Sequence, residues 1–126
     1  MHPFRAAIEA RDLDAATALL ADDVVFRSPV VFKPYEGSEA VGMLLRTVAT
    51  VFEDFSYTRE IGAPDSPDHA LVFQARVGDK QVEGCDFVHM GDDGKIHEFV
   101  VMIRPLSGAI ALAEAMGAKL AAAQQA

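Results

Sequence analysis

Hydrophobic positions in the first third of the chain recur with the spacing of helices. A first helix is expected from Pro3, because a proline lacks only an N–H that would have no partner in a first turn, and Phe4 and Ile8 then share one face. Asp12 is suited to cap a second helix, whose apolar stripe runs through Leu20. These two helices would each bury one side.

A strand and a stronger helix follow. The segment Val24–Ser28 has the composition of a short strand, and Pro29 is expected to end it. After a predicted loop, Ser38 is suited to cap a third helix. Its apolar positions recur three and four residues apart, as expected for one buried face: Val41, Leu44, Leu45, Val48, Val51 and Phe52.

The hydrophobic period then changes from that of a helix to that of a strand. Gly78-Asp79 and the stretch Gly91–Gly94 predict two hairpin turns, and Ser107 is suited to cap a final helix after Pro105. Four strands are expected, over residues 55–61, 71–77, 82–89 and 96–104. Helices followed by a run of strands predict an α+β fold, with a curved antiparallel sheet wrapped around three helices and a C-terminal helix.

The two turns predict which residues share a face of the sheet. A turn at Gly78-Asp79 places Leu71 opposite Asp86, and a turn at the Asp92-Asp93 region places Val88 opposite His97. The face that carries these residues is apolar except for Asp86 and His97. We therefore expect it to be the inner face.

The opposite face mixes charged residues with large apolar ones. Cys85, Phe87 and Met102 lie on it together with Glu83 and Arg104. Apolar residues surrounded by charges are typical of protein interfaces. We therefore predict a homodimer through this outer sheet face.

Composition limits the partners and the location. The 126 residues predict a single domain over 1–126, and the formal net charge of −8, with no run of basic residues, argues against nucleic acid and against a membrane surface as partners. A lone Cys85, the absence of an apolar leader and the absence of a membrane-length apolar run predict a cytoplasmic protein. No histidines have the spacing of metal ligands, so no metal or other cofactor is expected.

Three segments resemble one family in their order and spacing. The first runs from Asp12-Leu13-Asp14-Ala15 to Leu20-Ala21-Asp22-Asp23, the second is Tyr35-Glu36-Gly37-Ser38-Glu39-Ala40-Val41, and the third is Asp92-Asp93-Gly94-Lys95-Ile96. Together they resemble the SnoaL-like branch of the nuclear transport factor 2-like superfamily, which includes ketosteroid isomerases and polyketide cyclases. The resemblance implies a cone-shaped fold in which sheet and helices enclose an apolar cavity.

The resemblance also implies which catalytic groups are present. Ketosteroid isomerases use an Asp base together with a Tyr and a protonated Asp that stabilise the enolate. By the shared motifs, the Tyr position falls on Phe4, the base position on Ser28 and the protonated acid on Asp86. Two of the three groups are replaced, which argues against steroid isomerisation by that mechanism.

Asp86 is the leading candidate for chemistry. A carboxyl on an apolar face loses hydration, so its pKa should rise and its neutral form should serve as a hydrogen-bond donor or general acid. His97 is a weaker candidate, because the predicted register brings it near Asp86 but also near a hairpin end. The expected ligand pocket consists of Phe4, Ile8, Phe26, Ser28, Tyr35, Leu45, Phe73, Val88, Phe99, Val101 and Ile103.

Three functional hypotheses stay open at this point. In the first, the chain binds a small, largely apolar molecule between sheet and helices without chemistry. The second is a cofactor-independent isomerase, cyclase or hydrolase that uses Asp86 as acid or base. In the third, the chain is a dimeric interaction module whose cavity is filled by its own side chains.

Overall fold

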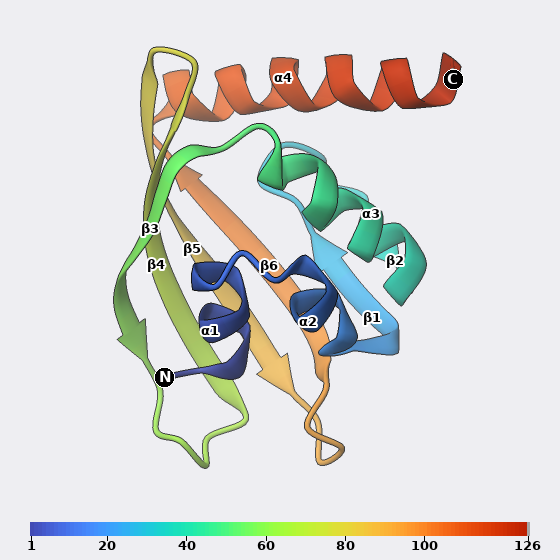
Figure 1. The fold of residues 1–126 in the computed structure, drawn as a ribbon, viewed down its shortest axis with the longest axis vertical. Helices are drawn as coiled ribbons and strands as arrows, with labels where there is room; N and C mark the ends of the chain where they lie inside the picture. The colour runs from blue at the N-terminus through green and yellow to red at the C-terminus, as the bar shows by residue number, and fades with distance from the viewer. Residues whose placement is uncertain (126) are drawn as a thin grey trace.

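The computed structural model describes residues 1–125. Figure 1 shows a curved sheet with α1, α2 and α3 on one side and α4 across one end. The helices are α1 (Pro3–Glu9), α2 (Leu13–Ala18), α3 (Ser38–Ala49) and α4 (Leu106–Gln125), and the strands are β1 (Leu20–Arg27), β2 (Tyr35–Glu36), β3 (Glu53–Ile61), β4 (Asp68–Val77), β5 (Lys80–Met90) and β6 (Ile96–Arg104). The α+β class is confirmed.

The six strands form one open sheet in the order β2-β1-β6-β5-β4-β3. The neighbouring strands run antiparallel, except that β1 and β6 run parallel. This parallel pair is the exception to the antiparallel sheet that the sequence predicts. Strands that are close in sequence pair through hairpins, whereas β1 reaches β6 across most of the chain, which is a pairing that no turn signal marks.

The first predicted hairpin has the expected register, and the second differs. Leu71 lies opposite Asp86, as the turn at Gly78-Asp79 predicts. The pairing beside the turn is already moved by one residue, so that Met90 lies opposite Ile96, and an irregularity at His89/Met90 moves it by one more. Asp86 therefore lies opposite Val101 and Val88 opposite Phe99. Because a two-residue shift preserves the alternation of faces, Asp86 still points to the inner side of the sheet.

Two boundaries differ from the hydrophobic pattern. The second helix ends at Ala18, and β1 starts at Leu20. Leu20 is buried and pairs with Ile96, so sheet pairing overrides the helical stripe there. The third helix is capped by Gly37 with a φ of 95° and not by the Ser38 side chain, since Ser38 is already helical. Glycine adopts this left-handed backbone without the clash that a Cβ would cause.

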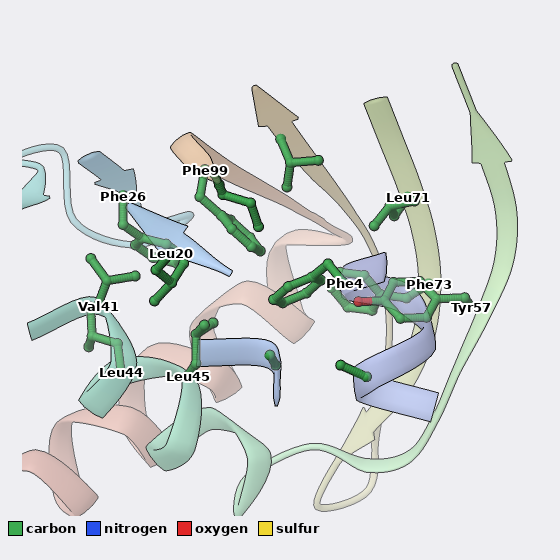
Figure 2. Close-up of a cluster of buried hydrophobic side chains, with 14 of the residues drawn as sticks. Phe4, Leu20, Phe26, Val41, Leu44, Leu45, Tyr57, Leu71, Phe73 and Phe99 are labelled. Atoms are coloured by element: carbon green, nitrogen blue, oxygen red, sulfur yellow. The ribbon is translucent and has the colours of Figure 1, made fainter. Parts of the chain in front are cut away.

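The core lies between the inner face of the sheet and the helices, as Figure 2 shows. Phe4 on α1 packs edge-on against Phe99 on β6, with ring centroids 5.1 Å apart. Leu44 and Leu45 of α3 are also buried in this cluster. Within residues 1–125, no helix combines the length and the apolar character needed to cross a membrane.

Candidate functional site

A cavity of about 790 Å³ lies between the inner face of the sheet and the helices. Three helices contribute several residues each to its lining, among them Phe4 and Ile8 of α1, Leu45 of α3 and Met116 of α4. The wall is mainly apolar. The volume of the cavity falls within the range of about 300–1,000 Å³ that is usual for small-molecule sites.

Nine of the predicted pocket residues line this cavity, and two do not. Val88 and Ile103 lie outside it, although both have the inward parity that the sequence predicts. Ile103 packs over Gly84, where an added Cβ would lie 2.7 Å from its Cδ1 atom, and Val88 is buried in the core. The nine residues that line the cavity are Phe4, Ile8, Phe26, Ser28, Tyr35, Leu45, Phe73, Phe99 and Val101.

Asp86 places a carboxyl group on the cavity wall. Only 6% of the residue is exposed, and its Oδ2 atom accepts a hydrogen bond of 3.0 Å from the Tyr57 hydroxyl. Burial raises the pKa of Asp86 to about 7, while the hydrogen bond from Tyr57 acts in the opposite direction. The carboxyl therefore changes charge near neutral pH. Its protonated form can donate a hydrogen bond to a ligand.

Tyr57 is the functional residue that the sequence analysis missed. It is 8% exposed and lines the cavity, with its ring edge-on to Phe55 at 5.0 Å between centroids. Burial, followed by the nearby charge of Asp86, raises the pKa of its hydroxyl, which therefore stays protonated and donates. A signal was available, because Tyr57 alternates in step with Phe55 on the strand that becomes β3.

His97 is not brought to Asp86. Its Nε2 atom lies 3.0 Å from Oδ1 of Asp93, and its Nδ1 atom lies 3.6 Å from Oδ1 of Asp23. The imidazole thus belongs to the β5–β6 hairpin and does not line the cavity. The two-residue shift of register is the reason, since Phe99 takes the place opposite Val88 that the sequence had assigned to His97.

Ser28 lines the cavity but already uses its side chain locally. Its Oγ atom accepts hydrogen bonds from the backbone N–H groups of Val30 and Val31, at 3.0 and 3.3 Å. The hydroxyl therefore orders the loop after β1 and is a poor base. Across residues 1–125, no group of three or more His, Cys, Asp or Glu side chains is arranged to hold a metal ion.

Comparisons with known proteins agree with this geometry. The family model of the SnoaL-like domain matches residues 2–99. A solved structure described as a steroid delta-isomerase from Pseudomonas aeruginosa is 47% identical in sequence, with a TM-score of 0.90 over 96% of this chain and 88% of that chain. No curated protein matches the chain.

Two further solved structures extend the relationship. An uncharacterised protein with a cystatin-like fold from Silicibacter pomeroyi is 36% identical, with a TM-score of 0.86 over 94% of this chain and 86% of that one. An NTF2-like protein of unknown function from Cytophaga hutchinsonii is 20% identical, with a TM-score of 0.61 over 82% and 85%, and supports the fold alone. The chain belongs to the SnoaL-like domain family.

Proposed function

We propose that this protein binds a small, largely apolar molecule with a carbonyl group in the cavity between sheet and helices. The observation that carries the proposal is Asp86, a buried carboxyl on an apolar cavity wall whose hydrogen-bond partner is Tyr57. When protonated, Asp86 donates a hydrogen bond to the ligand carbonyl. The apolar wall supplies the remaining affinity, because it removes the ligand's hydrocarbon surface from water.

A titration with a polycyclic ketone tests this proposal. The ketone should bind more tightly at about pH 5 than at about pH 9, because ionisation of Asp86 removes the donor. The corresponding hydrocarbon without oxygen is the matched ligand control, and its weaker binding should not depend on pH. In Asp86→Asn the amide donates at every pH, so ketone binding should lose its pH dependence. Equal pH profiles for ketone and hydrocarbon in the wild-type protein would contradict the proposal.

Catalysis by the same carboxyl is the second candidate. It is supported by the 47% identity to the chain described as a steroid delta-isomerase and by the pKa of Asp86 near 7, which suits proton transfer. Phe4 lacks a hydroxyl and Ser28 is committed to the loop, so Asp86 would have to act without those two groups. The ultraviolet absorbance of a β,γ-unsaturated steroid ketone rises when the double bond becomes conjugated. Turnover lost in Asp86→Asn would establish an enzyme, and binding without turnover would establish a binding protein.

We also propose a homodimer through the outer face of the sheet. Phe87 and Met102 are 41% and 59% exposed on this face, and the ion pair between Arg104 and Glu83 lies beside them. Exposed apolar residues with charges at their margin are suited to association. Sedimentation should give a dimer at micromolar concentration, and Met102→Glu should give a monomer. Met43→Glu, an equally exposed methionine on α3, is the control that should leave the dimer intact.

We also propose a cytoplasmic location. It is supported by the cysteine content, because Cys85 is the single cysteine of the chain and has no second cysteine with which to form an internal disulfide. Fractionation of cells with an antibody against the protein checks it, and recovery from an extracellular or envelope fraction would contradict it.

A further inference from the structure

The charged groups on the cavity wall are not equivalent, and Arg11 differs from the others. Besides Asp86, the acidic residues that line the cavity are Glu9, Glu53 and Asp54, and among residues 1–125 Arg11 is the basic residue that lines it. Each of the three carboxylates is engaged by an arginine from outside the cavity lining. Arg11 is not engaged in this way.

The acids are paired as follows. Glu9 accepts a hydrogen bond of 2.9 Å from Nε of Arg5, one turn earlier on α1. Arg76 forms an ion pair with Glu53 and holds Oδ2 of Asp54 at 3.1 Å from its Nη2 atom. Paired carboxylates attract a cationic ligand less than free ones, since their charge is already compensated nearby.

Arg11 has no such partner within the part of the chain that the structure describes. The ion pairs of arginines there involve Arg5, Arg27, Arg46, Arg76 and Arg104. A guanidinium group with free donors matches a carboxylate, which it can bind through two parallel hydrogen bonds. The wall therefore offers one uncompensated positive group, and it lies at an exposed residue, whereas Asp86 is buried.

The backbone holds Arg11 in a defined position. Its φ is 58°, in the left-handed region, and it follows the C-terminal end of α1. The N–H of Arg11 donates to the carbonyl of Ile8, and the N–H of Asp12 donates to that of Ala7. This is the arrangement in which helices usually end with glycine, because a Cβ is unfavourable there. An arginine at this point sacrifices stability that glycine would supply, which is understandable if its side chain serves a ligand.

We infer that Arg11 selects ligands that carry a carboxylate at the solvent-exposed end, with the ligand carbonyl at Asp86 and an apolar body between them. This inference rests on the proposed function and narrows its ligand class to apolar keto acids. A monoanion is favoured over a phosphate dianion, because Glu9, Glu53 and Asp54 share the same wall and oppose additional negative charge.

The experiment compares two probes that differ in charge and by one methyl group. A steroid with a ring ketone and a side-chain carboxylic acid is titrated into the full-length protein beside its methyl ester. The acid should bind about tenfold more tightly than the ester, as expected for one charge-assisted contact. The preference should shrink as salt is added, because a contact at an exposed guanidinium is screened.

Two variants of Arg11 separate selectivity from folding. Arg11→Gln should reduce the preference to less than about twofold. Arg11→Gly should do the same while raising the melting temperature, since glycine fits the left-handed position. Arg59→Gln removes another exposed arginine without an ion pair, outside the cavity lining, and should leave the preference unchanged.

The outcomes distinguish this inference from the proposal beneath it. If both probes bind equally to the wild-type protein, or if the preference for the acid survives in Arg11→Gly, the role of Arg11 is refuted and carbonyl binding stands. If neither probe binds, the proposed function for this class of ligand fails, and the role of Arg11 fails with it.

Discussion

Two buried polar residues, Asp86 and His2, lie in different surroundings, and comparing them shows that burial by itself does not identify a ligand site. Within residues 1–122, the buried polar or charged residues are His2, 5% exposed, and Asp86, 6% exposed. Asp86 faces the cavity beside Tyr57. His2 caps α1 through Nδ1, which accepts from the N–H of Phe4 at 3.0 Å, and its ring lies edge-on to that of His69 at 4.7 Å.

Burial favours the neutral form at both places, with opposite consequences for stability. It raises the pKa of Asp86 to about 7 and lowers the pKa of His2, whose neighbour His69 lowers it further. Asp86 therefore lowers the free energy of unfolding in alkali, and His2 lowers it in acid. Asp86 lines the cavity, whereas His2 caps a helix and does not line the cavity. The position at the cavity, and not burial by itself, therefore distinguishes the candidate ligand site.

The largest predicted effect is that Asp86→Asn stabilises the protein above neutral pH. Because the folded pKa of Asp86 is raised, the stability linked to its protonation is complete below the unfolded pKa and is lost as pH rises to about 7. At about pH 9 the variant should be more stable than wild type by on the order of 4 kcal/mol, since burial raises the pKa by about three units and each unit is worth about 1.4 kcal/mol. The amide oxygen still accepts from Tyr57.

Urea denaturation at about pH 5 and about pH 9 measures this difference. Asp65→Asn, in the exposed loop between β3 and β4, is the control for removing one negative charge. A gain of stability in Asp86→Asn that is equal at both pH values would contradict a raised pKa, because the gain must grow as the wild-type carboxyl ionises.

The next effect concerns Tyr57, which donates to Asp86. Tyr57→Phe removes this hydrogen bond, which favours the ionised carboxylate, and should therefore raise the pKa of Asp86 further. The loss at alkaline pH should be about 2 kcal/mol, as for a hydrogen bond to a charged group. Carboxyl chemical shifts across a pH series check the direction. Tyr35→Phe, on the same cavity wall, is the matched control and should leave the pKa of Asp86 unchanged.

Tyr57 also shows where sequence reasoning reaches its limit. The turn at Gly78-Asp79 fixed β4 against β5, so the position of Asp86 on the inner face could be predicted from local residues. The strand β3 is joined to β4 by a longer loop, and its pairing has irregularities between Glu53 and Ser56 and between Tyr57 and Arg59. The contact between Tyr57 and Asp86 crosses these irregularities, and no local pattern determines it.

The same reasoning explains the misplaced His97. A hairpin register read from turn residues is correct only if the strands beside the turn pair without a bulge. The pairing beside the turn and the irregularity at His89/Met90 each moved the register by one residue, and His97 lies beside Asp93. The face of the sheet on which each residue lies could be predicted, because a shift of two residues keeps the alternation of faces. The residue that lies opposite each position could not be predicted.

A smaller effect is expected at the second buried group. His2→Asn keeps a capping oxygen for the N–H of Phe4 but removes the imidazole. The folded pKa of His2 is lowered, so its contribution is complete above the unfolded value and is lost as pH falls below about 6.5. The variant should therefore lose less stability than wild type between about pH 7 and about pH 5. Thermal denaturation across this range measures it.

His2 is also surrounded by groups that temper its titration. Glu60 accepts from the backbone N–H of His2 through both carboxylate oxygens, at 3.1 Å each, and Arg5 lies 3.6 Å from the same carboxylate. The charge of Glu60 raises the pKa of His2 and so opposes burial and His69. Glu60→Gln should therefore increase the stability that the protein loses as pH falls from about 7 to about 5. An unchanged loss would show that burial dominates the pKa of His2.

The smallest effect is expected at Ser28, a polar group that shares the cavity with Asp86 but is already committed elsewhere. Ser28→Ala removes the acceptor for the N–H groups of Val30 and Val31, which should cost about 1 kcal/mol in a partly exposed loop. Ketone affinity should change by less than about twofold, since one hydrogen bond to the ligand would be worth more. Isothermal titration measures the ketone affinity and urea denaturation measures the stability, so together they separate a role of Ser28 in ligand binding from a role in the loop. A large loss of affinity with little loss of stability would place the Ser28 hydroxyl on the ligand, and Asp86 would then share the polar contacts of this cavity with Ser28.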